Sequence, residues 1–296
     1  MPDATGSAEK AAEVTREEGG RDPGTALVTG CSSGIGRATA LTFLADDWTV
    51  YATARNRDDL TDLSEAGCEI AALDVTDDAD VARVVDRVIA EDGRIDCLVN
   101  NAGYGQFGPL EELPVEALHR QFDVNVYGPH QLIRAILPHM REQGRGRIVN
   151  VSSASGRVSF PGGGAYCGAK FAVEAISDAL RGELEEFGID VVVVEPGPVE
   201  TEFTDRAETQ LDALERTGEY EWFYRIFEDT QAFGGGGPGA VAPEAVADAI
   251  LQAATCADPQ PRYPVGTVAS VAGVVRYVPD RIRDRAFGLA RRFLSR

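Results

Sequence analysis

The chain has 296 residues, 44% of them hydrophobic, and carries a formal net charge of −20 at neutral pH. This charge argues against a nucleic-acid partner, because the phosphate backbone would repel the protein. No apolar run approaches the roughly 18 residues of a transmembrane segment, and the polar N-terminus lacks the pattern of a secretion signal, so we expect a cytoplasmic protein.

Residues 1–23 are polar and charged, without a strong apolar face, and we predict that they form a disordered acidic tail. We expect one domain over residues 24–296. It opens with the apolar run ALVTG (26–30), which predicts a strand, and CSSGIGRATALTFLADD (31–47) follows as a glycine turn and a helix. Such a turn lets the backbone approach a pyrophosphate at the positive end of the helix.

Apolar, strand-like runs then alternate with helical patterns along the rest of the chain. Strands are predicted at 48–54, 68–75, 96–103, 147–153, 189–197 and 262–266, and helices at 57–66, 79–91, 115–126, 129–142, 165–187 and from about 243. This alternation predicts an α/β fold, in which a Rossmann-type, doubly wound parallel sheet forms a single domain. Ligands of such a sheet bind at the carboxyl ends of the strands.

The stretch SASGRVSFPGGGAYCGAK (153–170) places a hydroxyl, a phenol and an ammonium where they could act on one oxygen. Tyr166 and Lys170 are four residues apart, so on a helix they share one face, and a loop can return Ser153 beside the phenol. An ammonium about 4 Å away would lower the pKa of Tyr166 enough to make it a base near neutrality.

The alternative is that Tyr166 and Lys170 simply lie on an amphipathic surface helix. Lys10 and Lys170 are the only lysines among the 28 basic residues, so this chain uses arginine wherever a generic cation is needed. Retaining lysine at position 170 indicates a requirement for a compact ammonium with a tunable pKa.

Taken together, these motifs resemble the short-chain dehydrogenase/reductase family over about residues 24–266. The resemblance is carried, in chain order, by TGCSSGIG at 29–36, Asp74-Val75, NNAG at 100–103, Asn125, Ser153, Tyr166, Lys170 and PGPVET at 196–201. Within the family, VYATAR and KFAVEAISDALRGELEEFGI are similar to the group that contains 17β-hydroxysteroid and retinol dehydrogenases.

The resemblance implies a catalytic role for four residues. Tyr166 would be the acid/base and Ser153 would hydrogen-bond the same substrate oxygen. Lys170 would hold the nicotinamide ribose and lower the pKa of Tyr166. Asn125 would support a helix kink and a water that passes protons to Lys170, although an asparagine in this position could also simply cap a helix.

The same resemblance implies a nicotinamide cofactor, with Asp74 and the Val75 backbone at the adenine and Val199 and Thr201 at the carboxamide. The cofactor-binding residues it implies are Gly30, Ser32, Ser33, Gly34, Ile35, Gly36, Arg55, Asp74, Val75, Asn101, Ala102, Gly103, Tyr166, Lys170, Pro196, Gly197, Val199 and Thr201. The second strand ends without an acidic residue, and Arg55 could pair with a 2′-phosphate, so NADP(H) is favoured and NAD(H) is the alternative. Arg37 is expected to face solvent on the first helix.

Substrate specificity is expected in residues 200–240, because long loops beyond the sheet form lids. This segment is rich in aromatic residues, namely Phe203, Tyr220, Trp222, Phe223, Tyr224, Phe227 and Phe233, and ends in GGGG. The aromatic side chains either form a lid over the active site or belong to a helix that packs on the body of the domain. Phe107, Pro109 and Phe160 are candidates for the edge of the pocket.

The last segment, 276–296, contains seven arginines and two aspartates and predicts a basic helix. This helix could contact an anionic membrane or a partner, or it could be a surface helix paired with the acidic body. The family resemblance also implies a homodimer or homotetramer built on helices 129–142 and 165–187.

We therefore expect an oxidoreductase that transfers a hydride between NADP(H) and a secondary alcohol, ketone or aldehyde of a bulky, apolar kind such as a steroid, retinoid or fatty carbonyl. The alternatives are a non-catalytic dinucleotide-binding regulator and an epimerase or dehydratase of the same fold; the latter are usually longer. No metal site is predicted, because the five cysteines and three histidines show no ligand spacing.

Abundant acidic residues with almost no lysine are typical of a protein from a salt-accumulating halophile. High salt shortens the Debye length to about 3 Å at 1 M and screens the self-repulsion of the acidic surface. We predict that the melting temperature rises from dilute buffer to molar KCl, which a thermal denaturation series in KCl would measure. A protein that is most stable in dilute buffer would refute the halophile hypothesis.

Overall fold

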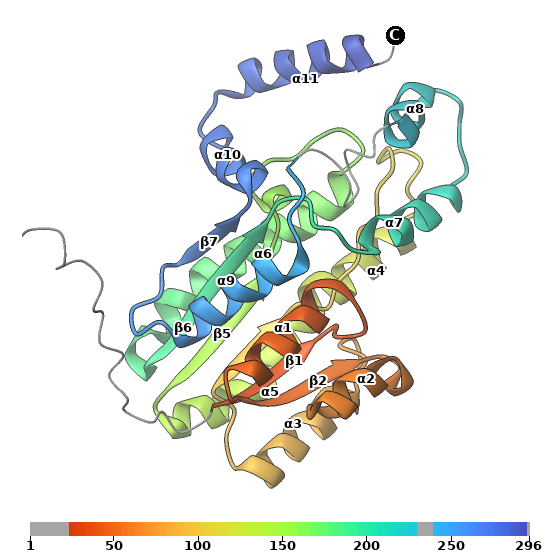
Figure 1. Cartoon of the computed structure of the whole chain (residues 1–296). Helices are drawn as coiled ribbons and strands as arrows, with labels where there is room; N and C mark the ends of the chain where they lie inside the picture. Colours follow the sequence, from red (N-terminus) through yellow and green to blue (C-terminus); the bar gives the residue numbers. More distant parts are fainter. Residues whose placement is uncertain (1–23, 230–238, 295–296) are drawn as a thin grey trace, which may run out of the picture.

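The computed structural model describes residues 24–229 and 239–294, and within them seven strands form one parallel sheet (Figure 1). The strand order is β3-β2-β1-β4-β5-β6-β7, which confirms the predicted doubly wound α/β fold. The strands are β1 (Thr25–Thr29), β2 (Thr49–Ala54), β3 (Glu69–Ala72), β4 (Cys97–Asn100), β5 (Gly146–Val151), β6 (Ile189–Pro196) and β7 (Arg262–Val265). The predicted N-terminal tail and the segment from Phe233 through the GGGG run lie outside the described residues.

The helices are α1 (Gly34–Ala45), α2 (Thr61–Ala66), α3 (Asp78–Asp92), α4 (Val115–Phe122), α5 (Gly128–Gln143), α6 (Gly164–Leu184), α7 (Phe203–Asp212), α8 (Glu221–Asp229), α9 (Pro243–Thr255), α10 (Thr267–Val275) and α11 (Asp280–Leu294). Short 3-10 turns precede α2 (Arg57–Leu60), follow β5 (Ala154–Gly156) and follow α6 (Glu185–Phe187). None of these described helices is both long and apolar enough to cross a membrane.

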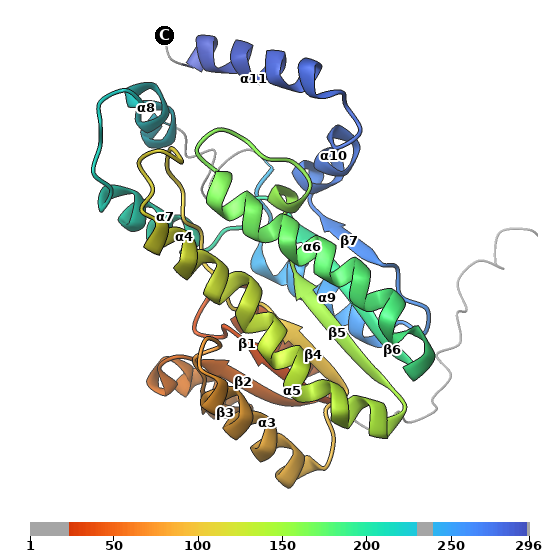
Figure 2. The ribbon, with the colours of Figure 1, turned by 180° about the vertical axis from the view of Figure 1, so that it is seen from behind.

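Two hydrophobic layers enclose the sheet. Helices α1 and α9 cover one face, whereas α3, α5 and α6 cover the other (Figures 1 and 2). Successive residues of a strand point to opposite faces, so Ala26 and Val28 of β1 join the first layer and Leu27 joins the second. Burial on both faces explains why the strands are continuous apolar runs in the sequence.

The connection out of β1 changes direction across the sheet. The chain runs from β1 to β2 and β3 on one side and then returns to β4, which pairs with β1 on its other side. The loops after β1 and β4 therefore diverge at the carboxyl ends of these strands. This is the topological switch point at which doubly wound sheets bind their ligands.

A π-helical turn (Asp123–Tyr127) joins α4 directly to α5, so the two helices predicted separately form one continuous run. Asn125 is buried in this turn, and its side chain accepts a hydrogen bond from the backbone N–H of Tyr104 and donates one to the Tyr104 carbonyl. Asn125 therefore ties an irregular helical turn to the loop after β4. It does not cap a helix, and the capping alternative is wrong.

Candidate active site

The turn between β1 and α1 is packed so closely that side chains are excluded from it. Gly30 has a φ of +75°, and a Cβ there would lie 2.8 Å from the Cα of Ala102. A Cβ on Gly36 would lie 2.2 Å from the carbonyl oxygen of Gly30, which is closer than van der Waals contact allows. Two of the predicted glycines are thus required by the close approach of α1 to the end of β1.

Hydrogen bonds from the neighbouring loop hold this turn in place. The Thr29 hydroxyl accepts bonds from the backbone N–H groups of Asn101 and Ala102, both at 3.0 Å. The Asn101 side-chain amide donates to the Thr29 carbonyl at 2.9 Å and reaches the Gly30 carbonyl at 3.3 Å. Asn101, predicted to line the cofactor, thus also braces the glycine turn.

The N-terminus of α1 opens into a cleft of about 600 Å³ whose lining includes Ser32, Gly34 and Thr201. No acidic side chain lies in the first turn of α1, and the Ser33 side chain makes no capping hydrogen bond. The backbone N–H groups at a helix start that is not capped in this way form a site for a phosphate. The backbone at this turn therefore suits the pyrophosphate of a dinucleotide, although Glu200, Glu202 and Glu244 also line the cleft.

Arg206 on α7 reaches the same place and was not predicted from the sequence. Its guanidinium donates to the Ser33 hydroxyl at 3.3 Å and pairs with Glu202 at 3.1 Å. The contact joins residues 173 positions apart, so no local pattern could have indicated it.

The predicted catalytic residues converge at the carboxyl end of β5. Ser153 follows this strand, and its hydroxyl hydrogen-bonds the phenol of Tyr166. Tyr166 and Lys170 lie one turn apart on α6, as predicted, and the Lys170 ammonium stands 5.8 Å from the centre of the Tyr166 ring. Both side chains are buried, and the ammonium donates to the Val151 carbonyl at 2.8 Å.

The predicted lowering of the Tyr166 pKa is not found in this structure and needs correction. Burial raises the pKa of Tyr166 to about 12, although the hydrogen bond from Ser153 opposes the shift. Burial also lowers the pKa of Lys170 to about 8. The cost of removing both groups from water outweighs the attraction of the ammonium for a phenolate.

A buried ionic cluster lies behind Lys170. Glu174, one turn further along α6, raises the pKa of Lys170 against the effect of burial. The Arg262 Nε lies 3.1 Å from Glu174 and 3.2 Å from Glu195, and Arg157 approaches the same two carboxylates. The isolated acid in the apolar run VVVVEPG was the sequence signal for Glu195, which the sequence interpretation did not use.

Aromatic side chains from three separate segments pack around Tyr166. The Tyr166 ring centroid lies 5.4 Å from that of Phe107 and 5.5 Å from that of Phe203, and Phe227 of α8 contacts Phe107. The aromatic residues of the 200–240 segment that the structure describes therefore pack on the body beside Tyr166, as the packing alternative predicts.

Other predicted residues lie on the loops that follow the strands, and a Cβ on Gly34 would lie 2.9 Å from the Thr201 side chain. Asp74 follows β3 and holds Thr76 through its carboxylate, while Gly197 follows β6 and Val199 pairs with Val241. Arg55 is exposed just beyond β2. Arg37 lies on α1 as expected but forms an ion pair with Asp62, so it is not simply a solvated cation.

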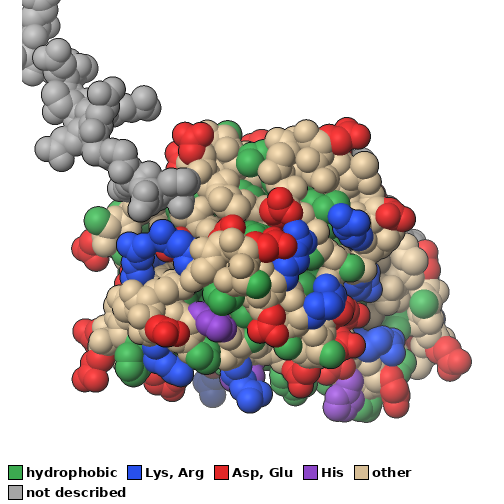
Figure 3. Space-filling model, turned by 90° about the horizontal axis from the view of Figure 1, so that it is seen from below, with side chains coloured by type: hydrophobic (Ala, Val, Ile, Leu, Met, Phe, Trp, Pro, Cys, Tyr) green, Lys and Arg blue, Asp and Glu red, His purple; other side chains and the backbone are tan. Residues whose placement is uncertain are grey.

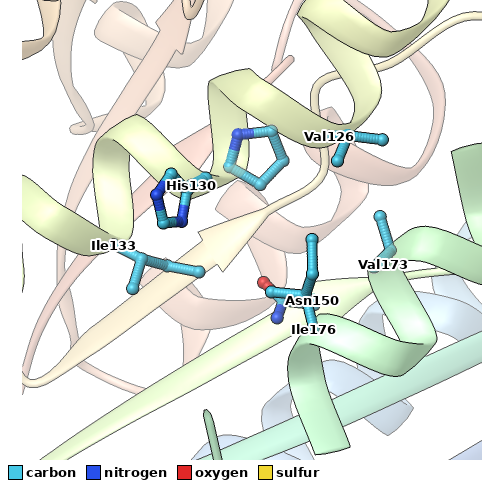
Figure 4. Close-up of a pocket in the computed structure, with 7 residues that line it drawn as sticks. Val126, His130, Ile133, Asn150, Val173 and Ile176 are labelled. Atoms are coloured by element: carbon cyan, nitrogen blue, oxygen red, sulfur yellow. The ribbon is translucent and has the colours of Figure 1, made fainter. Parts of the chain in front are cut away.

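A small cavity of about 10 Å³ lies between α5 and α6 (Figure 4). It is lined by His130 and Ile133 of α5, Asn150 of β5, and Val173 and Ile176 of α6. Its volume is that of about one water molecule, so it accommodates neither a dinucleotide nor a carbonyl substrate.

The chain is similar in sequence and structure to known dehydrogenases and reductases. A family model described as short chain dehydrogenase covers residues 24–212. The NADPH-dependent 3-dehydrocapnine reductase of Ornithobacterium rhinotracheale is 33% identical across 88% of this chain and 95% of that protein. The 17-beta-hydroxysteroid dehydrogenase type 1 of Homo sapiens is 36% identical across 80% of this chain and 76% of that protein. The crystal structure of a short-chain dehydrogenase from Streptomyces avermitilis is 35% identical, with a TM-score of 0.75 over 90% of this chain and 95% of that one.

We predict that Gly36→Ala lowers the free energy of unfolding by about 1–3 kcal/mol, because the new methyl group would displace the Gly30 backbone. Urea denaturation measures the change. Gly182→Ala is the matched control, since a Cβ there meets no atom within 4 Å and alanine favours the helix. Equal effects of the two substitutions would contradict the close packing of the turn.

Proposed function

Because this chain belongs to the short-chain dehydrogenase/reductase family, we propose that it transfers a hydride between NADP(H) and a bulky, apolar ketone, aldehyde or secondary alcohol. It is an NAD(P)-dependent oxidoreductase that acts on CH–OH groups. The observation that carries the more specific proposal is the buried Tyr166 phenol, which is hydrogen-bonded to Ser153 and surrounded by aromatic rings.

The residues at the switch point are suited to a dinucleotide. The glycine turn brings the backbone close to the cleft, and the α1 N-terminus offers N–H groups to the pyrophosphate. In this proposal Asp74 and Val75 would contact the adenine, and Lys170 and Thr201 would hold the nicotinamide end. When bound, the reduced nicotinamide supplies the hydride that a carbonyl carbon accepts.

Ser153 and Tyr166 would position and protonate the substrate oxygen. The Tyr166 phenol, with a pKa of about 12, is protonated at neutral pH and can donate its proton as negative charge develops on the carbonyl oxygen. Ser153 would hydrogen-bond the same oxygen and fix its direction. The nearby Lys170 ammonium, with a pKa of about 8, is the stronger acid of the two and stabilises the phenolate that remains.

An apolar substrate is supported by the side chains that surround Tyr166. Phe107, Phe160, Phe203, Phe223 and Phe227 belong to one cluster with the phenol. Such a surrounding excludes water, strengthens hydrogen bonds to the reacting oxygen and favours a carbon-rich substrate. The human relative is named for a steroid, which is a substrate of this kind.

NADP(H) is supported by the end of β2. The residues from Tyr51 to Arg55 include no carboxylate, and the exposed Arg55 just beyond β2 would pair with a 2′-phosphate. The relative from Ornithobacterium is named as NADPH-dependent.

We predict that Tyr166→Phe lowers turnover by a factor of about 10² to 10⁴, because the ring keeps its packing while the proton donor is lost. NADPH affinity should change by less than about threefold. Turnover with a panel of apolar ketones and a fluorescence titration of NADPH measure the two quantities. Tyr127→Phe makes the same chemical change at an exposed position and serves as the control.

Full turnover in Tyr166→Phe would refute the assignment of the proton donor. Tight NADPH binding without oxidation by any ketone or aldehyde would instead favour a dinucleotide-binding regulator. The titration therefore separates failure of the catalytic proposal from failure of the cofactor proposal.

We predict that Arg55→Ala weakens NADPH binding by about tenfold or more and leaves NADH binding unchanged, because a charge-assisted hydrogen bond to the 2′-phosphate is lost. The neighbouring Arg57→Ala removes the same charge beside the site and should have a smaller effect. A wild-type protein that binds NADH as tightly as NADPH would contradict the proposed preference.

A further inference from the structure

The outward face of α10 is apolar. Val268, Val271 and Val274 follow one another at three-residue spacing and are exposed, with Val274 exposed to 70%. Ala269 and Ala272 point the other way and are buried where α10 packs on β7 and on the 3-10 turn after β5. Val268 also lies against Gly197 and Gly239, whereas Val271 and Val274 are the more exposed of the three valines.

The turn after α10 and the helix α11 also carry exposed apolar side chains. Tyr277 in the turn is 80% exposed. Ile282 and Leu289 are exposed two helical turns apart and lie on one side of α11. We call Val268, Val271, Val274, Tyr277, Ile282 and Leu289 the α10–α11 apolar face. They are half of the twelve large hydrophobic side chains found exposed among the described residues.

The same segment carries exposed arginines, which give it a positive charge although the chain as a whole is negative. Arg276, Arg281 and Arg285 are exposed in the same segment. From residue 276 to the end of the sequence there are seven arginines and two aspartates, in a chain whose net charge is −20. An exposed apolar face bordered by arginine is typical of a helix that lies in a membrane interface.

The position of these helices leaves the face accessible. In Figures 1 and 2, α11 runs across one end of the molecule, beyond the sheet and at the same end as α8. Figure 3 views the molecule from the opposite end, where acidic and basic side chains are interspersed and hydrophobic ones are scattered singly. Six exposed large apolar side chains lie on α10, the turn after it and α11, whereas the end seen in Figure 3 is charged.

We propose that the α10–α11 apolar face docks on an anionic lipid surface. The valines, Tyr277, Ile282 and Leu289 enter the boundary between headgroups and acyl chains. Arg276, Arg281 and Arg285 lie at the level of the anionic headgroups, to which each basic residue adds roughly a fivefold gain in affinity. The helices lie on the membrane and do not cross it.

A second copy of the chain is a poorer occupant of this face. A two-fold symmetric contact brings identical patches together, so the arginines of one copy would meet those of the other. A contact with a different surface of the second copy would build a ring or a filament of many copies instead of a closed pair. An anionic lipid surface satisfies the apolar side chains and the arginines at once.

Docking does not depend on the proposed reaction. One consequence rests on the proposed function. If the chain is the proposed reductase, docking would turn α8 and the aromatic segment at the same end of the molecule toward the lipid. Apolar substrates dissolved in the membrane would then reach Tyr166 from that side.

Vesicle flotation tests the proposal with the full-length protein. Wild type is expected to float with vesicles of equimolar phosphatidylcholine and phosphatidylglycerol, and at least about fivefold less with phosphatidylcholine alone. Binding should fall as KCl is raised from about 0.1 M to 1 M, because the Debye length shrinks from about 10 Å to 3 Å. Turnover is not part of this readout.

Two double variants separate the contributions of the face. Val271→Glu with Val274→Glu should lower the partition coefficient on anionic vesicles by tenfold or more, and Arg281→Glu with Arg285→Glu should do the same at low salt. Phe187→Glu is the control, because Phe187 is also exposed, to 42%, but lies on the turn after α6. All variants should retain the wild-type circular dichroism spectrum and NADPH affinity.

The proposal is overturned if wild type does not float with anionic vesicles, or if the valine variant floats as well as wild type. It is also overturned if light scattering shows that the valine substitutions split an oligomer while vesicles bind neither form, which would make the face an interface between copies. Equal flotation with neutral and anionic vesicles would overturn the role of the arginines.

Discussion

The hydrogen bonds between Thr29 and Asn101 connect the two loops on which the site depends. Thr29 ends β1 and Asn101 follows β4, so their contact spans the point where the direction of the sheet connections reverses. The contact keeps Ala102 against Gly30 and leaves no space for side chains in the turn. The start of α1 is thereby fixed, and with it the direction in which its N–H groups point.

The proposed catalytic groups are held in a way that has a cost in stability. Tyr166 and Lys170 are buried together, and burial moves the two pKa values in opposite directions, toward the neutral form of each group. The Val151 carbonyl and the nearby Glu174 charge partly compensate for the lost hydration of the ammonium. Titratable groups whose pKa values are shifted by burial are characteristic of active sites, where they are positioned for the reaction more than for stability.

The buried ionic cluster behind Lys170 reaches the edge of the sheet and also buries charged groups at a cost in stability. Glu174 and Glu195 are buried beside Arg157 and Arg262, and burial together with the neighbouring Glu174 raises the pKa of Glu195 to about 7. The ion pairs are incomplete, because one carboxylate oxygen of Glu174, one of Glu195 and the Arg157 Nε are buried without a hydrogen-bond partner. The α6 segment that carries Lys170 is in this way coupled to β6 and β7.

The sequence by itself determined the alternation of strands and helices, the glycine turn and the pairing of Tyr166 with Lys170 on one helix face, because each is a local pattern within a few residues. It also located Ser153 and the aromatic segment that packs beside Tyr166. Only the tertiary structure decided the direction of the Tyr166 pKa shift, the contact of Arg206 with Ser33 and the role of Asn125 in the π-helical turn. It likewise decided which apolar residues near the C-terminus stay exposed. The reason is physical: burial and long-range contacts depend on segments far apart in the chain, and local patterns carry no information about either.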